Sequence, residues 1–300
     1  MIKIYDCFQF LDEEMLLDLR LNVMDKYVHK FVITEATYTH NGKPKKLIFD
    51  INKFSKFEKK IIYIVVDKQP PDLLQIDKKD NDLEDTRGQK LVLNGYKRDN
   101  YQRQMAQKVL NNINPEDWII INDIDEIPNL ENIDFNKIEN KLIFFKQQIF
   151  YYKFNLLYPN APWFGSRACR KKNFLTPQWL RNAKHKKYPL WRPDIIFSKR
   201  KYNNILYINN GGWHFTNIKS PEDMEKKFLN YTHHYEFEES KISIEDLRKK
   251  IKEKKIIYDH SVDQRGYKWG SEKTLSKIEL SKMPNYMQEN QIKYKDWLET

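Results

Sequence analysis

The sequence has little cysteine and glycine, and it has no long apolar run. Its two cysteines, Cys7 and Cys169, cannot build a disulfide framework, and Cys7 falls in an apolar stretch that suits a small buried side chain. An uninterrupted apolar run of about 18 residues, which a membrane-spanning helix needs, does not occur. Asp6 also comes too early for the apolar region of a signal peptide. We therefore expect a chain without a membrane anchor that works in the cytoplasm.

Several well-known catalytic motifs are also missing from the sequence. No G-x-x-x-x-G-K-[ST] or G-x-G-x-x-G pattern occurs, which argues against a P-loop or a dinucleotide site. No Cys/His cluster has the spacing of a zinc site, and no serine nucleophile elbow is present. The chemistry must therefore be sought in other residues.

The charge balance is strongly positive. The chain has 53 Lys and Arg against 42 Asp and Glu, which gives a formal charge of +11. Such an excess fits an anionic partner, for example nucleic acid, an acidic membrane surface or a phosphorylated substrate. A general bias towards Lys, Ile and Asn would produce the same excess, so charge alone does not choose a partner. Aromatic residues, 14% of the chain, can stack on sugars or bases, although most should lie in the core.

Three carboxylates follow one of the most apolar stretches of the chain. Residues 118–121 read Trp-Ile-Ile-Ile, which is typical of a strand buried on both faces of a parallel sheet. Asp123, Asp125 and Glu126 come directly after it. Like charges this close repel one another, and carboxylates at the end of such a strand suit a divalent cation such as Mg2+ or Mn2+. The alternative is an ordinary acidic turn closed by Pro128.

The apolar pattern along the chain predicts an α/β fold. Strands are expected at 2–8, 27–36, 61–66, 118–121, 142–152, 194–197 and 205–208. Helices are expected at 11–24, 87–112 and 176–182, after Ser220, and over the basic stretch from 244 to 297. The candidate N-caps are Asp12, Thr176 and Ser220. A β-α-β unit should open the sheet, and 72–85 should be an exposed or mobile loop.

Other polar residues fall where ligands bind in such sheets. Glu35 lies near the carboxyl end of the second expected strand, where it either meets a ligand or is only solvated. Arg98 and Arg103 lie on the helix that precedes the acidic segment. They can reach a phosphate there, or they can form weak surface ion pairs.

Two short aromatic segments contain glycine. Trp163 and Gly165 stand in a proline-bounded loop that suits stacking on a sugar face, although packed loop tryptophans are as frequent. The two glycines at 211–212 let the backbone approach a ligand or another chain segment closely, just before Trp213 and His214. His214 is then a metal ligand or hydrogen-bond donor, or else a satisfied core residue.

Taken together, these segments resemble glycosyltransferase family 17. The matching blocks are IYDCFQF at 4–10, LLDLRL at 16–21, FVITEA at 31–36, GKPK at 42–45, DIDEIP at 123–128, WFG at 163–165, GWHF at 212–215 and MPNY at 283–286. They cover most of the chain in the expected order. Two places depart from the family, because FLDE at 10–13 replaces its usual Asn-Glu and the acidic loop 72–85 has no counterpart.

The resemblance implies a GT-A fold, in which helices flank a Rossmann-like, mixed but mostly parallel sheet and a helical segment ends the chain. It implies a nucleotide-sugar donor, UDP-GlcNAc first among UDP-sugars, a glycan or glycoconjugate acceptor, and inversion at the anomeric carbon. A divalent cation, Mn2+ or Mg2+, would bind at Asp123 and Asp125, and His214 would complete its coordination. Asp125 is the direct ligand in this interpretation, and Asp123 lies nearer the ribose and the metal.

The resemblance also suggests roles for residues around the cation. The candidate donor-binding residues are Glu35, Lys43, Arg98, Arg103 and Asp123, with the three cations as phosphate partners. The candidate acceptor- or sugar-binding residues are Trp163, Gly165 and Trp213. Glu126, Asp194 and Glu222 remain alternatives for the base that an inverting displacement needs, although a helix start behind Ser220 also explains Glu222.

We expect one GT-A domain over 1–300, with a nucleotide-binding half at 1–128, an acceptor-side half at 129–240 and a helical extension at 241–300. Nucleic acid is not an expected partner of such an enzyme. Two other classes stay open. A basic nucleic-acid-binding protein or metal-dependent nuclease would bind DNA or RNA tightly and with steep salt dependence. A glycan-binding protein on an inactive transferase scaffold would bind sugars without turnover, although both aspartates are retained.

Overall fold

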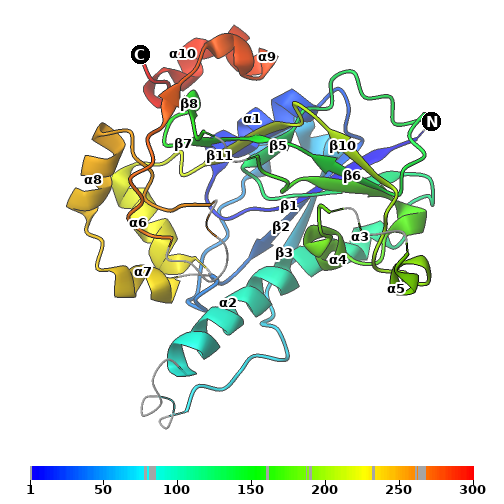
Figure 1. Cartoon of the computed structure of the whole chain (residues 1–300), viewed down its shortest axis with the longest axis horizontal. Coiled ribbons are helices and arrows are strands. Elements are labelled where there is room, and N and C mark those ends of the chain that lie inside the picture. The colour runs from blue at the N-terminus through cyan, green and yellow to red at the C-terminus, as the bar shows by residue number, and fades with distance from the viewer. Residues whose placement is uncertain are drawn as a thin grey trace.

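Two β-sheets and the helices around them form a mixed α/β fold in the computed structural model (Figure 1). The structure describes residues 2–77, 80, 86–159, 162–186, 188, 191–231, 234–260, 262 and 268–300. In the larger sheet the strand order is β10 (Ile205–Ile208), β6 (Leu142–Phe145), β9 (Arg167–Arg170), β4 (Trp118–Ile121), β1 (Ile4–Gln9), β2 (Lys30–Ala36) and β3 (Ile61–Val66). Among these seven strands β9 runs antiparallel to its neighbours, and the other pairs are parallel. The predicted fold class, a mostly parallel Rossmann-like sheet flanked by helices, is confirmed.

The larger sheet is buried on both faces because helices cover each of them, which suits apolar strands such as β4 and β6. On one face, α1 (Glu14–Met24) packs with α9 (Asn285–Glu289) and α10 (Gln291–Tyr294) over side chains such as Ile4 and Phe8. On the other face, α3 (Gln107–Leu110) and α4 (Pro177–Asn182) contribute to the core around Tyr5 and Cys7. Burial of large aliphatic and aromatic side chains stabilises such a core by about 1.5–3 kcal/mol each.

The predicted strand at 142–152 is in fact two strands in two sheets. β6 belongs to the larger sheet, whereas β7 (Gln148–Tyr151) belongs to a second sheet with the order β12 (Ser276–Lys277), β8 (Leu156–Leu157), β7, β11 (Gly212–Thr216), β5 (Glu126–Pro128). The break comes at Gln147, whose backbone N–H and C=O pair with Trp163 at 2.8 and 2.9 Å. An apolar run does not show where a strand leaves one sheet for another, because both halves are buried.

The close approach predicted at the double glycine is confirmed, and the neighbour is another segment of the chain. Gly212 has a φ of +119°, and a Cβ there would lie 2.1 Å from the carbonyl oxygen of Ile127. β11 can therefore pair with β5, which begins at the third carboxylate of the acidic segment. This pairing brings His214 opposite Glu126.

Three predictions of local structure require correction. The stretch 194–197, which was predicted to be a strand, is helical in α5 (Pro193–Ile196), because Pro193 favours a helix start. The predicted helix 87–112 is divided into α2 (Thr86–Gln104) and α3. Asp12 does not cap α1, whose N-cap position is Glu13 and has no side-chain cap bond. The caps at Thr176 and Ser220 are confirmed, because their hydroxyls accept from Trp179 N and Asp223 N at 3.0 and 3.1 Å.

The C-terminal part is only partly helical. After α6 (Pro221–Asn230), α7 (His234–Ser240) and α8 (Ile244–Lys252), the chain crosses back through isolated bridges Lys255–Thr274 and Tyr258–Trp269 and through β12 before it reaches α9 and α10. Short 3-10 segments lie at Ile51–Lys60, Lys171–Asn173, Leu280–Lys282 and Lys295–Trp297. Part of the predicted loop 72–85, namely 78–79 and 81–85, lies outside the described residues. None of the helices described combines the length and the apolar character needed to cross a bilayer.

Candidate active site

The acidic segment lies where the order of the larger sheet reverses. β1 pairs with β2 on one side and with β4 on the other. In open α/β sheets, ligands bind beside the carboxyl ends of the strands at such a switch point. The turn 122–126 leaves β4 at this edge and leads into β5.

A buried arginine on α1 holds this turn in place. Arg20 is fully buried, and its guanidinium donates to both carboxylate oxygens of Asp6 at 2.8 and 2.7 Å. The same guanidinium donates to the carbonyl oxygens of Asp123, Ile124 and Glu126 at 3.2, 3.3 and 2.7 Å. The backbone of the acidic turn is therefore fixed before any ligand binds.

A cavity of about 460 Å3 opens beside the turn. Segments far apart in the sequence contribute to its wall: the end of β1 and the start of α1, the end of α2, the acidic turn, α4, β11, α6 and the residues around 258–260. Its charged and histidine lining residues are Glu13, His40, Asp99, Arg103, Asp123, Asp125, Glu126, Arg181, His214, Lys227, His260 and Lys268. The turn contributes three carboxylates to this lining.

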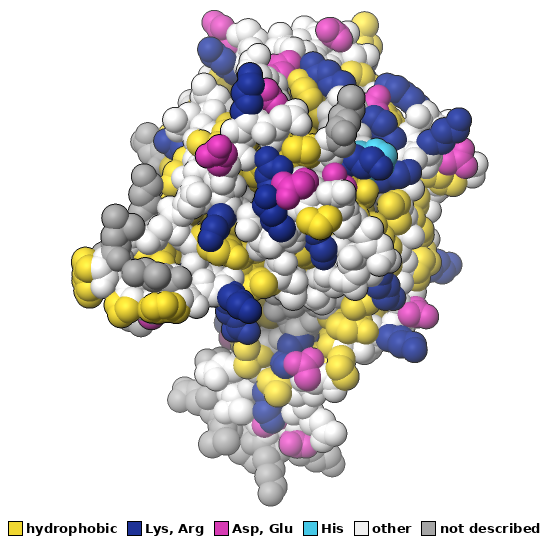
Figure 2. All heavy atoms as spheres, turned by 90° about the vertical axis from the view of Figure 1, so that its right-hand side faces the viewer, with side chains coloured by type: hydrophobic (Ala, Val, Ile, Leu, Met, Phe, Trp, Pro, Cys, Tyr) yellow, Lys and Arg dark blue, Asp and Glu magenta, His cyan; other side chains and the backbone are white. Residues whose placement is uncertain are grey.

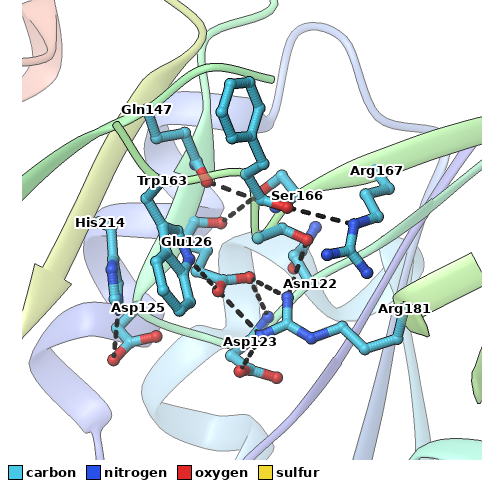
Figure 3. Close-up of polar contacts among 12 residues, drawn as sticks. Asn122, Asp123, Asp125, Glu126, Gln147, Trp163, Ser166, Arg167, Arg181 and His214 are labelled. Carbon is cyan, nitrogen blue, oxygen red and sulfur yellow. Dashed lines mark hydrogen bonds and ion pairs between the residues drawn. The ribbon is translucent and has the colours of Figure 1, made fainter. Parts of the chain in front are cut away.

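Arginines hold two of these carboxylates, and Figure 3 shows the contacts of Arg181 with both. Asp123 accepts from Arg103 Nη2 at 3.2 Å and from Arg181 Nη2 at 2.5 Å. Glu126 accepts from the two terminal nitrogens of Arg181 at 2.6 and 2.9 Å. Glu126 also accepts from the backbone N–H of Asp123 at 2.9 Å and from the Trp163 indole N–H at 2.5 Å. Its carboxylate is fully buried, so its charge is compensated entirely inside the protein.

Burial and the guanidinium groups together set the pKa values of Asp123 and Glu126, which form the arginine side of the turn with Arg103 and Arg181. Burial favours the neutral acid, but Arg181 outweighs it and holds the pKa of Glu126 below its usual range. Burial prevails over the arginines at Asp123 and raises the pKa of that carboxyl. Glu126 therefore anchors Arg181 and Trp163, and its oxygens are not free to take a proton from an acceptor.

The remaining carboxylate of the turn lies beside histidines. Asp125 Oδ2 is 3.7 Å from His214 Nε2. Burial opposes ionisation of Asp125, yet the interaction with His214 outweighs it and leaves the pKa well below the usual range. The His214 ring stacks on Trp163, with ring centroids 4.8 Å apart, and meets His260 edge-on at 5.9 Å. His214 Nδ1 and His260 Nε2 are buried without a hydrogen-bond partner among the described residues.

Asp125 and His214 fit a divalent cation better than Asp123 does. They offer a carboxylate and an imidazole that face each other, and the unpartnered ring nitrogens leave this side short of polar contacts among the described residues. Both oxygens of Asp123, by contrast, are engaged by arginines. No group of three or more His, Cys, Asp and Glu is arranged for a metal in the described part of the chain. Asp125 offers the oxygen ligands that Mg2+ and Mn2+ prefer, and Mg2+ sites usually take one or two carboxylates and complete their shell with phosphates and water.

Gly165 shapes the site by its lack of a side chain. A Cβ there would lie 1.9 Å from Glu126 Oε1 and 2.2 Å from Trp163 Nε1. Its carbonyl oxygen accepts from Arg181 Nη1 at 2.8 Å. Trp163 lines the cavity, as a residue that contacts a sugar must. Gly165 does not line it, and instead leaves room for the hydrogen bond between Glu126 and Trp163.

Three predicted donor-binding residues do not line the cavity. Glu35 is fully buried beneath its own following loop. Lys43 is exposed on that loop. Arg98 donates to Gln69 Oε1 at 2.8 Å and to the carbonyl oxygen of His40 at 3.1 Å. Of the predicted phosphate partners, the structure brings Arg103 to the acidic turn.

Trp213 points away from the cavity that His214 lines, since neighbours on a strand face opposite sides. It lines a second cavity of about 660 Å3 beside residues 281–289, and its indole N–H donates to the carbonyl oxygen of Lys282 at 2.8 Å. The structure therefore separates Trp213 from the acidic turn.

Two of the predicted base candidates also lie elsewhere. Asp194 forms ion pairs with Arg192 and Lys201 at 2.8 and 2.9 Å on the surface. Glu222 stands in the first turn of α6 and pairs with Arg248 at 2.7 Å. Neither side chain lines the cavity of the acidic turn, so each has a surface ion pair in place of the predicted contact with an acceptor.

Arg181 and His260 contribute to the site but were not predicted from the sequence. The helix that carries Arg181 was predicted from Thr176 and Pro177, and the acidic turn indicated that a positive group should lie near it. Nothing local connects the two, because Arg181 is 55 residues from Glu126. His260 lies in a segment that was predicted to be helical, where it carried no signal of its own.

Comparison with known proteins identifies the family. The model of Glycosyltransferase family 17 matches residues 1–299. The β-1,4-mannosyl-glycoprotein 4-β-N-acetylglucosaminyltransferases of Homo sapiens and Rattus norvegicus are each 29% identical to this chain over 131 residues. Each match covers 41% of this chain and 21% of the relative, so the matched region spans about a fifth of those proteins' length.

Solved structures show a weaker likeness. Two crystal structures of LgtC, one of an active-site mutant and one of this galactosyltransferase with donor and acceptor sugar analogues, are 14% identical to this chain. They cover 70% of this chain and 73% and 74% of their own, with a TM-score of 0.30. The fold assignment accordingly rests on the strand order itself. Because the family model spans almost every residue, the predicted family is confirmed, and the chain belongs to glycosyltransferase family 17.

Proposed function

We propose that this chain transfers a sugar from a nucleotide-sugar donor to a hydroxyl of a glycan acceptor, in the cavity beside the acidic turn. The observation that carries the proposal is the division of the turn into two sides. Asp125 and His214 line the cavity with a carboxylate and an imidazole that can bind a cation, and Arg103 and Arg181 line it with guanidinium groups. A diphosphate leaving group needs both kinds of partner, because its negative charge grows as the sugar leaves.

Each side of the turn then has a chemical task. Asp125 and His214 would hold a divalent cation, which when bound offsets the charge that develops on the leaving diphosphate. Arg103 and Arg181 line the cavity, where each can donate both to Asp123 and to a phosphate oxygen. Asp123 fixes both guanidinium groups and remains the candidate for a contact with the donor ribose. Trp163 offers an aromatic wall to a sugar ring.

The donor and the stereochemistry are inferred from the family. The named relatives are N-acetylglucosaminyltransferases that act on β-1,4-mannosyl glycoproteins. We therefore take UDP-GlcNAc as the first donor and a mannose-bearing glycan as the first acceptor to test, with transfer that inverts the anomeric carbon. The Mn2+ or Mg2+ requirement belongs to the same proposal.

The charge on one face of the molecule does not favour the nucleic-acid alternative (Figure 2). On the face shown in Figure 2, Lys and Arg side chains are scattered among acidic and apolar ones. A nucleic-acid site concentrates its cations along the track of the phosphate backbone. The acidic turn would also repel such a backbone unless a cation were bound.

A thermal-shift screen tests the proposal. The full chain is melted with UDP-GlcNAc, UDP-galactose, UDP-glucose and GDP-mannose, each with and without Mn2+. We expect stabilisation that requires both the cation and one nucleotide sugar, worth about 2.7 kcal/mol when the ligand is at 100 times its Kd. Release of UDP in the presence of a glycopeptide that carries β-1,4-linked mannose then measures transfer. Stabilisation by DNA or RNA with steep salt dependence, and by no nucleotide sugar, would contradict the proposal.

A further inference from the structure

Five carboxylates of the described residues line the cavity, and four of them are already engaged. Arg103 donates to both oxygens of Asp99 at 3.0 Å. Asp123 and Glu126 are held by the arginines of the turn, and Asp125 faces His214. The fifth is Glu13, which has no ion-pair partner within 4 Å among the residues that the structure describes.

Glu13 lines the cavity, and its side chain does not cap the helix that follows it. It occupies the N-cap position of α1 but makes no side-chain cap bond there. Oε2 accepts from the backbone N–H groups of Leu11 and Asp12 at 3.2 and 3.1 Å. The carboxylate is thereby held on the turn between β1 and α1, and its other oxygen is left for a ligand. This wall of the cavity belongs to different elements from the arginine side.

We infer that Glu13 is the catalytic base of the transfer and accepts the proton of the acceptor hydroxyl. The inference rests on the proposed function and selects a residue that sequence reasoning did not consider for this role. As the acceptor oxygen bonds to the anomeric carbon, the bond from that carbon to the phosphate oxygen breaks. The bonding pair leaves with the nucleoside diphosphate, and the hydroxyl proton passes to the Glu13 carboxylate. Water later takes this proton, so Glu13 returns to its ionised form.

The surroundings of Glu13 make its carboxylate a stronger base than an exposed glutamate. Burial raises the pKa of Glu13 above its usual range, and Asp12 on the same turn adds to the effect. Lys219 and Lys227, from the β11–α6 connection and α6, oppose it without forming an ion pair with Glu13. A base works best when its pKa approaches the working pH. The geometry and the charges therefore point to the same residue.

The substitution Glu13→Gln removes the base but keeps the size of the side chain. With UDP-GlcNAc, Mn2+ and the mannosyl glycopeptide, we expect kcat to fall about 100- to 10,000-fold. The Kd of UDP with Mn2+ should stay at its wild-type value, and so should the melting temperature. The matched control is Glu14→Gln, since Glu14 is paired with Lys53 at 2.6 Å on the surface and does not line the cavity. That variant should keep wild-type turnover.

Two further readouts separate a base from a merely structural residue. Wild-type kcat should decline as the pH falls through the raised pKa of Glu13, because protonation removes the base, and E13Q should lose this acidic limb. Formate should partly restore turnover in Glu13→Ala by acting as a small external base. Turnover of E13Q equal to that of Glu14→Gln, a loss explained by weaker UDP binding, or no rescue by formate would each overturn the role of Glu13. If the wild-type chain itself releases no UDP, the proposed function fails instead.

Discussion

Two strand ends of the larger sheet carry buried carboxylates at the same edge, and the protein uses them differently. Glu35 lies near the end of β2, and the acidic turn follows β4. Glu35 accepts from the backbone N–H groups of Ile48 and Phe49 at 2.9 and 3.2 Å, from Tyr63 Oη at 2.7 Å, and from Lys45. Its loop folds over it and satisfies both oxygens. The acidic turn instead opens on a cavity that Asp125 and His214 line together.

The comparison shows that the position of a carboxylate at the ligand-binding edge does not decide its role. Both ends were candidates for donor binding because ligands bind at the carboxyl ends of parallel strands. The difference lies in what the following chain does. Residues 45–49 return to Glu35, whereas β5 leads away from Asp125 and leaves it to meet β11. A carboxylate becomes a ligand site when its own loop leaves it unsatisfied.

The substitution Asp125→Asn should produce the largest effect on function. It removes the charge on the cavity side of the turn, so we expect turnover of UDP-GlcNAc to fall at least about 100- to 1,000-fold. The Mn2+-dependent thermal shift with UDP should disappear while the melting temperature without ligand stays close to wild type. The control is Asp134→Asn on the surface, paired with Lys137. Full activity in Asp125→Asn would contradict the comparison, because Asp125 would then contribute no more to turnover than Glu35, which its own loop covers.

The substitution Arg181→Met should produce the largest loss of stability. It leaves the fully buried Glu126 without its partner, which costs about 3–5 kcal/mol of unfolding free energy. Urea denaturation measures the loss. The control is Arg248→Met, which breaks an exposed pair and should cost about 0–1 kcal/mol. Similar losses in both variants would mean that the ion pair between Arg181 and the buried Glu126 contributes no more to stability than an exposed pair.

The pH dependence of Arg181→Met has a defined sign. In the wild type, the pKa of Glu126 is held below its ordinary 4.5, so this carboxylate stabilises the fold above that pH and the contribution is lost as the pH falls. Without Arg181, the main interaction that opposes burial is lost, so the pKa of Glu126 should rise. The gap in unfolding free energy between wild type and variant should therefore be widest at pH 7 and narrow as the pH falls towards 4.5.

The substitution Glu35→Gln tests the carboxylate that its own loop covers. We expect a loss of about 1–3 kcal/mol in unfolding free energy, because the amide cannot satisfy all the donors that now face the buried carboxylate. Binding of UDP with Mn2+ should not change. Glu245→Gln, at an exposed position of α8, is the matched control for stability. Weaker UDP binding in Glu35→Gln would return this residue to the donor site.

The smallest effect is expected at the two cysteines, which lie within strands of the same sheet. Burial raises the pKa of both thiols, and neither side chain is exposed. Ellman's reagent should therefore leave the native protein unmodified and react with both thiols after unfolding. Reaction in the native state would show that the strands, and not only their ends, open to solvent.

Much of the fold could be predicted because it depends on local patterns. Residues 61–66 and 118–121 are continuously apolar over the length of a strand, and β3 and β4 have those bounds. Thr176 with Pro177, and Ser220 with Pro221, marked two helix starts by hydrogen bonds within one turn. The break between β6 and β7 could not be predicted, since it depends on Trp163 pairing with Gln147 from a later segment.

In the candidate site, too, features formed by neighbouring residues could be predicted and features formed by distant residues could not. The acidic turn was visible because its three carboxylates are neighbours in the sequence, and their mutual repulsion already required a positive partner. The identity of that partner was not visible. Arg181 arrives from α4 and Glu13 from the start of α1, and neither stands out from ordinary surface residues in the sequence.

The sequence by itself determined that an apolar sheet would end in clustered negative charge, because strand burial and like-charge repulsion act over a few adjacent residues. Only the tertiary structure decided which carboxylates would be neutralised and which would remain available. Ion pairs and hydrogen bonds are formed by whichever side chains the fold brings within about 3 Å, whatever their distance along the chain. In this way Arg181 pairs with Glu126, and the loop after β2 forms hydrogen bonds with Glu35. Asp125 and Glu13 line the cavity instead.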